Sequence, residues 1–346
     1  MRASAGVAGA LAAALVLGPW SARADAPGTP PEHRRGEEQT FLTFPEWFLV
    51  YSPEEYAAFV RDRPPSDFPF LGHVGQLWSS YLSVLRFTRG RYPPNLGYHA
   101  MILVIGVSTT LEYSLRAGYE GLLGRLTALS ARHGMTAEDR FGARAAADYV
   151  DFLRERPWYE FDFLARLRGL WTATPALGPD MLRKWERRYA LTTEYAAKAL
   201  YGRLIGGGTR STYERPILVT AAWIDRLPPG LEAELPELRV LARRGDGSAL
   251  VTLPRYAPFT AAAATLAARG VTFREIAGNH GLVLVSALGP AGGAPPAAGV
   301  TRLFSQPILT RPGRERVALA TPVGSLAALL RALPAAGYEL EHVYDY

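Results

Sequence analysis

The chain has no cysteine and almost no lysine. Among its 346 residues there is no cysteine, which excludes disulfides, thiolate nucleophiles and cysteine-held zinc or iron–sulfur sites. Only two of its 38 basic residues are lysines, Lys184 and Lys198. Acidic residues alternate with the basic ones almost everywhere, whereas nucleic-acid binding needs a clustered basic face. We therefore predict no nucleic-acid partner, and the run Arg183 to Arg188 is interpreted as a solvated helix face.

Several motifs of known chemistry are also missing. No Gly-x-Gly-x-x-Gly follows a strand and opens a helix, and the chain has neither a P-loop nor a Gly-x-Ser-x-Gly elbow. A Glu-x-x-His spacing occurs at Glu339 and His342, but it lies in a predicted strand, where these two residues face opposite sides. The sequence therefore predicts no metal site, and it leaves any cofactor unknown.

The first 26 residues have the composition of a secretory signal peptide. Arg2 gives a short positive start, residues 3–18 are uncharged and mostly Ala, Val, Leu and Gly, and alanines follow at 22, 24 and 26. This order is typical of a segment that is removed during export. Cleavage after Ala24 is favoured over cleavage after Ala26, because the latter leaves Pro27 beside the cut. We expect a signal peptide at 1–24 and an exported protein, in the periplasm or on the periplasmic face of the inner membrane.

The next part of the chain predicts helices. Residues 25–39 are polar and predict a disordered lead-in, and residues 40–206 predict an α-helical domain. Ser52, Pro53 and Glu55 have the spacing of a capped helix start. Helices are also expected at about 70–88, 98–132 and 179–205, and a further one capped by Thr136 with Asp139. The glycines at 206–208 are expected to end the last helix and to form a linker.

The remaining residues, 211–346, change to short apolar runs bounded by turns. Eight strands are expected there, with helices at 257–268 and 325–335. Residues 249–276 and 317–343 each have the order strand, proline, helix, glycine, strand. Two such units side by side would give a ferredoxin-like sheet with duplicated βαβ units. The predicted fold class is therefore α+β, with an N-terminal α-helical bundle followed by a ferredoxin-like domain.

Two uncharged stretches raise the question of a membrane. Residues 68–85 and 92–111 have no formal charge, and Arg86, Arg89 and Arg91 lie between them. Two membrane spans with this loop inside would agree with the positive-inside rule. However, His73, Gln76 and several serines are a heavy polar load for lipid. We favour a buried helical hairpin in the bundle, and membrane association through 68–111 stays open as the alternative.

The same hairpin contains the candidate catalytic residues, His73 and Glu112. If the two helices run antiparallel about a turn near Tyr92, these residues lie at one level. A carboxylate inside a bundle needs a partner, and His73 would provide one. The pair would act as a general base, or it would form a core hydrogen bond that fixes the helix register. We favour the structural role.

Two aromatic and acidic segments are candidates for ligand binding. One spans Thr43 to Phe48 and the other Arg156 to Phe163. Rings beside carboxylates can bind a sugar or a cationic ligand, although they can also anchor irregular segments to a bundle. The candidate ligand-binding residues are Glu46, Trp47, Trp158, Tyr159, Glu160 and Asp162.

Residues 40–205 resemble a group of exported bacterial proteins of unassigned function. The resemblance rests on the two aromatic segments and on two short sequence motifs, Gly97-Tyr98-His99 and Ile105 to Ser108. It implies a shared helical domain, and it implies no activity. The leading functional hypothesis is binding or assembly on the periplasmic side of the membrane, with an envelope protein or a small molecule as partner. The alternatives are a hydrolase- or isomerase-type enzyme using His73 and Glu112, and a membrane-embedded accessory subunit built around 68–111.

Overall fold

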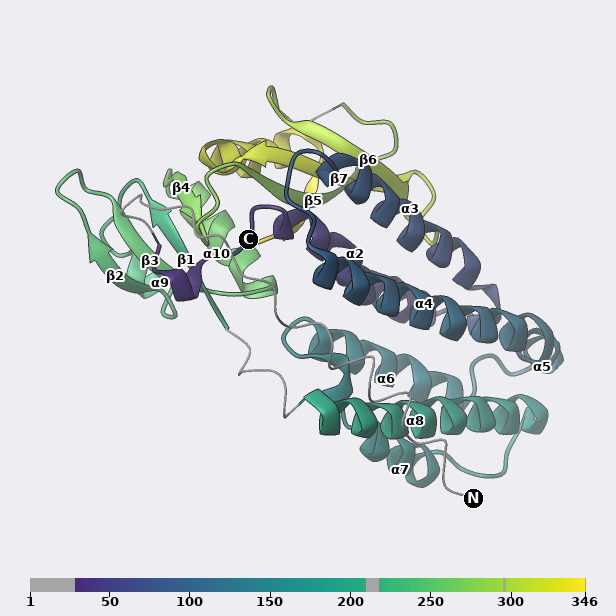
Figure 1. The fold of residues 1–346 in the computed structure, drawn as a ribbon. Coiled ribbons are helices and arrows are strands. Elements are labelled where there is room, and N and C mark those ends of the chain that lie inside the picture. Colours follow the sequence, from purple (N-terminus) through teal and green to yellow (C-terminus); the bar gives the residue numbers. More distant parts are fainter. Residues whose placement is uncertain (1–28, 210–217, 295–296, 346) are drawn as a thin grey trace, which may run out of the picture.

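A computed structural model describes residues 29–209, 218–294 and 297–345. The expected signal peptide and its cleavage site lie outside these residues. The first described part is helical, as predicted, and the second part contains the strands (Figure 1). The helices of the first part are α2(Gln39–Phe59), α3(Phe70–Thr88), α4(Leu96–Tyr119), α5(Arg125–Ser130), α6(Ala137–Leu153), α7(Phe163–Ala173) and α8(Met181–Thr209), with a π-helical turn η3(Glu120–Gly124) between α4 and α5 and a short turn η4(Trp158–Glu160) before α7.

Eight strands form two four-stranded antiparallel sheets. All eight lie where the alternating runs predict them. Sheet 1 contains β1(Val219–Ile224), β2(Arg239–Arg243), β3(Ala249–Pro254) and β4(Phe273–Ile276) in the order β2-β3-β1-β4. Sheet 2 contains β5(Leu282–Pro290), β6(Thr301–Pro307), β7(Arg314–Pro322) and β8(Glu339–Val343) in the order β6-β7-β5-β8. The short helices are α9(Leu231–Glu234), α10(Ala257–Ala268) and α11(Leu326–Ala332).

The predicted repeat exists, but its two copies do not share one sheet. The first copy is β3-α10-β4 in sheet 1, and the second is β7-α11-β8 in sheet 2. Within each copy the two strands are not neighbours, because β1 pairs with both β3 and β4, and β5 pairs with both β7 and β8. The expectation missed this because the strand that separates each pair precedes the repeat in the sequence.

One apolar core joins the two sheets. Its members come from both sheets and from α10 and α11, which pack against each other. Phe259 and Leu266 of α10 and Leu326 of α11 are fully buried in it. Alanines occupy much of α10, so the two helices can approach closely. Helices on one face of an antiparallel sheet bury that face and leave the other for a second partner.

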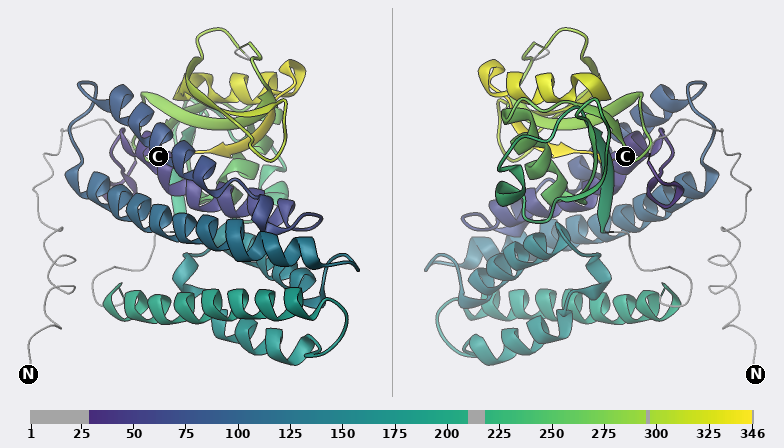
Figure 2. Two further views of the ribbon diagram at one scale, coloured as in Figure 1. Left: turned by 90° about the vertical axis from the view of Figure 1, so that its right-hand side faces the viewer. Right: turned by 90° about the vertical axis from the view of Figure 1, so that its left-hand side faces the viewer.

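The second face of sheet 2 is covered by α2. Phe44 of α2 packs edge-to-face on Phe304 of β6, with ring centroids 4.9 Å apart. The hydroxyl of Tyr51 lies 2.8 Å from that of Ser286 in β5. Figures 1 and 2 show α2, α3 and α4 between sheet 2 and the layer made by α6, α7 and α8. The helical half and the strand half therefore share a buried core across the expected boundary at 206–211.

The expected disordered lead-in is wrong for its described part. Residues 29–38 lie along sheet 1, where the backbone N–H of Arg35 donates to the carbonyl of Ala277 at 2.8 Å. The N–H of Thr29 donates to Glu275 at 3.3 Å. Polar composition predicted disorder, but backbone groups of this segment find partners on a strand edge, which composition does not reveal.

Local helix signals had mixed success. The expected helix at 70–88 is α3, and the capping box of Thr136 with Asp139 is present at the start of α6. The expected start at Ser52 is wrong, because α2 runs through Ser52 and Pro53. The side chains of Ser52 and Glu55 are engaged with other helices and strands, as described below. The glycines at 206–208 lie inside the bounds of α8, so they do not end it.

Candidate functional site

A cavity of about 440 Å³ lies among the helices of the first half. Its walls come from α2, α4, α6 and α8 and from the turn η4. Pockets that hold small molecules have volumes of roughly 300–1,000 Å³, so this one is large enough for a ligand. Its apolar lining includes Phe48, Val104, Ile105, Ala145, Ala146 and Leu191. We refer to it as the inter-helix cavity.

Four charged side chains form one wall of the inter-helix cavity. Lys198 lies 3.1 Å from Glu112 and 2.9 Å from Glu194. Arg116 lies 3.7 Å from Glu112 and 3.5 Å from Glu194. Burial alone would raise the pKa of Glu194, but the charges of Arg116 and Lys198 outweigh it and lower this pKa to about 2. Two acids and two bases thus balance, and α4 is joined to α8 through this wall.

Aromatic rings surround the polar wall. Trp158 of η4 stacks on Tyr201 of α8, with ring centroids 5.3 Å apart and planes 24° from parallel. The ammonium of Lys198 lies 5.4 Å from the ring centre of Tyr149 and 5.8 Å from that of Phe163. An ammonium over ring faces is attracted by their quadrupoles. The cavity therefore combines flat apolar surfaces with one charge-balanced wall, and Glu46 and Arg156 line it as well.

Three of the six expected ligand-binding residues line this cavity, namely Glu46, Trp158 and Tyr159. Glu46 accepts a hydrogen bond of 2.7 Å from the hydroxyl of Tyr98. Burial raises the pKa of Glu46, and the bond from Tyr98 opposes that shift only in part. Residues that are distant in the sequence thus line one cavity. The two short segments that contain them did not indicate this shared location.

The other three expected ligand-binding residues lie elsewhere. Trp47 packs on the imidazole of His342, with ring centroids 3.6 Å apart, and it lines a different cavity. Asp162 caps α7 by accepting from the backbone N–H of Ala165 at 2.8 Å. Glu160 lies exposed in η4. Asp162 therefore has the capping role of the structural interpretation, whereas Trp47 lies inside α2 and packs on sheet 2.

The expected partnership of His73 with Glu112 does not form. Nδ1 of His73 lies 2.9 Å from the hydroxyl of Ser52, and its Nε2 lies 3.6 Å from Oε2 of Glu55. Glu112 pairs with Arg116 and Lys198 instead. The register argument considered only the α3–α4 hairpin, whereas His73 contacts Ser52 and Glu55 of α2 and Glu112 contacts Lys198 of α8. The imidazole is fully buried, and burial followed by the nearby Arg316 charge lowers its pKa to about 3.

His73 belongs to a buried chain of polar side chains. Beyond Ser52, the chain continues to the hydroxyl of Tyr113, which is 2.7 Å from that of Ser52. The 3.6 Å between Nε2 of His73 and Oε2 of Glu55 is a contact without a hydrogen bond. On the far side of this contact, Nη1 of Arg316 in β7 donates to Glu55 at 3.0 Å. Arg316 in turn donates from Nε to Glu341 of β8 at 2.8 Å. We call Tyr113, Ser52, His73, Glu55, Arg316 and Glu341 the polar relay.

The polar relay connects two cavities. Ser52 and Tyr113 line the inter-helix cavity. Glu55, Arg316 and Glu341 line a second cavity of about 210 Å³ beside sheet 2. Burial raises the pKa of Glu55, and the Arg316 charge opposes that shift. The sequence marked Ser52 and Glu55 as a helix start and His73 as a candidate catalytic residue, but it did not indicate their partners, which lie far apart in the sequence on α4, β7 and β8.

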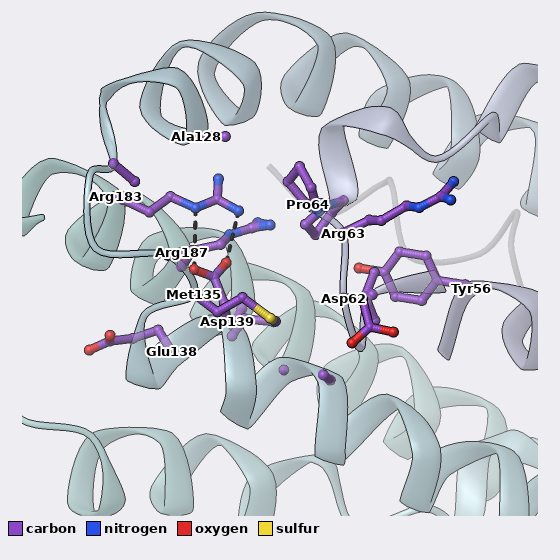
Figure 3. A pocket seen from close by; sticks show the side chains of 17 residues that line it. Tyr56, Asp62, Arg63, Pro64, Ala128, Met135, Glu138, Asp139, Arg183 and Arg187 are labelled. Carbon is purple, nitrogen blue, oxygen red and sulfur yellow. Dashed lines mark hydrogen bonds and ion pairs between the residues drawn. The ribbon is translucent and has the colours of Figure 1, made fainter. Parts of the chain in front are cut away.

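A third cavity, of about 240 Å³, lies beside a dense ionic network (Figure 3). There Arg183 donates to Asp139 at 2.8 Å, and Arg187 donates to Glu120 at 2.8 Å. Glu138, fully buried, accepts from Lys184 at 2.9 Å and from Arg188 at 2.8 Å. The expectation of a solvated face at 183–188 is wrong, because the four bases of this run point inward to acids on α6 and η3. The alternation of charges in the sequence could not distinguish a solvent-exposed helix face from a buried network of ion pairs.

Neither a metal site among the described residues nor a known family points to the function of these cavities. Within residues 29–209, 218–294 and 297–345, no three His, Asp or Glu side chains gather in a way that could hold a metal ion. The chain matches no protein-family model, no curated protein and no solved structure.

Proposed function

We propose that this protein is an exported cell-envelope protein that binds a small, mainly apolar molecule in the inter-helix cavity. The observation that carries the proposal is the cavity itself, with its volume of about 440 Å³ and its largely apolar and aromatic walls. Cavities of this kind, with a few convergent polar groups, are the usual form of small-molecule sites. Export is inferred from the composition of residues 1–24.

The charges in the wall indicate the kind of ligand. Glu112, Glu194, Arg116 and Lys198 neutralise one another within the described helices. A ligand with a net charge would have to disrupt these pairs, and partly buried pairs are costly to disrupt. We therefore expect a ligand without net charge, whose apolar part lies against Phe48, Ala146 and Trp158.

An enzyme that uses His73 has less support. A general base works best when its pKa lies near the operating pH, and burial lowers the pKa of His73 to about 3. Its neighbour Ser52 does line the inter-helix cavity, but the Ser52 hydroxyl is shared with Tyr113. Both features favour a structural role for the polar relay.

For the fold, we propose that each sheet is a reduced ferredoxin-like unit. That topology has the chain order βαββαβ and a central pair of strands that never follow each other in sequence. In both sheets the first and third strands are central, and the second and fourth lie at the edges. The helix α9, of four residues, would be the remnant of the first helix in sheet 1.

Binding of N-phenylnaphthylamine, a neutral apolar dye that fluoresces in apolar surroundings, tests the proposed function. We expect saturable binding at one site per chain. The variant Ala146→Phe places a ring into the cavity, and we expect it to weaken dye binding by about tenfold or more, because the ring occupies apolar surface that the dye would cover. Thermal unfolding of each variant would check that the fold is kept.

The neighbouring variant Ala147→Phe is the matched control. Ala147 lies on the same helix with similar exposure, but it does not line the cavity. It should leave dye affinity within about twofold, as expected for a surface change. Equal weakening by both variants, or the absence of saturable binding to the parent protein, would contradict the proposal.

A further inference from the structure

The buried face of helix α8 is charged, and its solvent-exposed face is apolar. Arg183, Lys184, Arg187 and Arg188 are each at most 4% exposed. On the opposite side of the same turns, Leu182 is 63% and Tyr189 is 64% exposed. A helix on the surface of a water-soluble protein has the reverse arrangement. Further along the same face, Leu200 and Leu204 are also exposed.

The segment from α4 to α5 is arranged in the same way. Three of its charged residues, Glu112, Arg116 and Glu120, turn toward α8, where each has an ionic partner, and the fourth, Arg125, is exposed. Its outward face carries large apolar side chains over roughly 30 Å of helix length. Those side chains, 61–76% exposed, are Val107, Leu111, Leu115, Leu122, Leu126 and Leu129.

Ion pairs join the two helices that carry these apolar faces. Along α4 and η3, Glu112 reaches Lys198, Arg116 reaches Glu194 and Glu120 reaches Arg187, so α8 runs in the opposite direction to α4. Tyr119 and Tyr189 meet between the helices, with ring centroids 6.3 Å apart. In Figure 1, α4, α5 and α8 lie on the side of the molecule away from sheet 1, with α6 drawn between α4 and α8. We call the outward apolar sides of α4, α5 and α8 the α4–α8 face.

The fully exposed charges on this face have one sign. Arg125 of α5 and Arg203 of α8 are exposed. The acids of these helices point inward and are paired, and the most exposed of them, Glu112 at 41%, is bound to both Arg116 and Lys198. A second copy docked on this face would bring arginines together without acids to balance them. Anionic lipid headgroups complement them, and each Lys or Arg near such a surface adds to binding.

The geometry also indicates how a bilayer would be contacted. Leu96–Ser130 is long and apolar enough to cross a membrane by length and composition, and only 22% of its most apolar window is buried. If this segment crossed the bilayer, Glu112, Arg116 and Glu120 would enter the hydrocarbon region or lose their partners on α8. Either outcome has a high cost in free energy. Lying in the interface buries the outward leucines and leaves these ion pairs intact.

We propose that the α4–α8 face binds flat to the surface of a bilayer that contains anionic lipid. Such a surface extends the molecule's role beyond the inter-helix cavity, and it is carried by different residues. It differs from the alternative of two membrane spans at 68–111, because the contact is made by the outward faces of α4, α5 and α8.

Vesicle sedimentation tests this inference. The protein is purified in the processed form that the cells make, which is common to all variants, and it is mixed with vesicles of phosphatidylcholine alone or with about 30 mol% phosphatidylglycerol. We expect binding to the anionic vesicles and at least about fivefold weaker binding to the neutral ones. The double variant Leu115→Glu/Leu122→Glu should weaken binding by about tenfold or more, because two exposed apolar side chains are lost from the lipid contact. Arg125→Gln should weaken binding to anionic vesicles alone, by roughly fivefold.

The control is Leu218→Glu/Leu241→Glu, two leucines of similar exposure on sheet 1. This variant should bind like the parent. The inference is overturned if the parent does not bind anionic vesicles, or if both double variants lose binding equally. It is also overturned if sedimentation velocity shows a parent dimer that Leu115→Glu/Leu122→Glu abolishes while vesicle binding is unchanged. Dye binding in the inter-helix cavity should survive Leu115→Glu/Leu122→Glu, so failure of one proposal is separable from failure of the other.

Discussion

Ser52 and His73, on neighbouring helices, are joined by a hydrogen bond of 2.9 Å between Oγ and Nδ1. Both side chains are buried, and the Ser52 hydroxyl also contacts Tyr113 at 2.7 Å. Three helices, α2, α3 and α4, therefore share a single hydroxyl group. Because sheet 2 reaches the same relay through Arg316 and Glu55, this small group of atoms joins the helical half to the strand half.

Removing that hydroxyl should destabilise the fold. We expect Ser52→Ala to lower the free energy of unfolding by about 2 kcal/mol, because His73 Nδ1 and the Tyr113 hydroxyl are both left without a partner in a buried site. Tyr113→Phe keeps the bond between Ser52 and His73 and should cost about 1 kcal/mol. Urea unfolding monitored by circular dichroism measures both. A smaller effect for Ser52→Ala than for Tyr113→Phe would show that the hydroxyl is not the shared centre.

The buried imidazole of His342 should make stability depend on pH. Burial lowers its pKa from 6.5 to about 3. In the window between these values the unfolded chain takes up a proton that the folded state does not, so stability falls as pH decreases. One such group contributes a slope of about 1.4 kcal/mol per pH unit. Glu55, whose pKa is raised by burial, acts in the opposite direction, because the folded state binds its proton first.

The variant His342→Gln isolates this contribution. Its stability, measured by urea unfolding at several values between about pH 6 and pH 4, should fall less steeply than that of the parent by about 1.4 kcal/mol per pH unit. The comparison of slopes is independent of any constant loss from the substitution. Parallel slopes would mean that His342 is protonated in the folded protein or reached by solvent.

Gly124 should be required in the π-helical turn η3. A β-carbon at this position would run into the carboxylate of Glu120, the residue that pairs with Arg187. We expect Gly124→Ala to lower the free energy of unfolding by about 2 kcal/mol, because the carboxylate must move from a buried ionic network. Gly121 lies in the same turn with open space around it.

Gly121→Ala is therefore the matched control. It should raise stability by up to about 1 kcal/mol, because alanine has the higher helix propensity. Thermal unfolding of the two variants under one buffer condition gives the comparison. If both variants changed the free energy of unfolding equally, helix propensity, and not the Glu120 carboxylate, would determine the effect of alanine at position 124.

Periodic features of the sequence predicted the secondary structure well. The alternating runs located all eight strands, α3 was found with its ends, and the pair Thr136 and Asp139 marked the start of α6. Each of these signals acts over a few residues. The predictions that failed concerned polar side chains. Ser52 was predicted to cap a helix, and the basic residues at 183–188 were predicted to be exposed to solvent. Whether a polar side chain faces water depends on which helices pack around it, and a local window does not contain that information.

The candidate site shows the same division. Glu46, Trp158 and Glu112 were singled out as unusual, and all three line the inter-helix cavity. Their common location could not be predicted, because they come from α2, η4 and α4. Glu55 and Arg316 were not candidates at all, since their sequence separation is large and nothing in their immediate surroundings is unusual.

The packing of α2 on sheet 2 has a consequence for the order of folding. Thr40, near the start of α2, donates to the carbonyl of Tyr344 and accepts from the N–H of Leu284. A ribosome releases Thr40 some three hundred residues before it releases Tyr344. The face of α2 that packs on sheet 2 therefore stays uncovered until β5 and Tyr344 have been made, although α3, α4 and α6 can already pack on its other faces. Contacts between such distant residues make folding slow, so we expect the packing of α2 on sheet 2 to be a late step in folding.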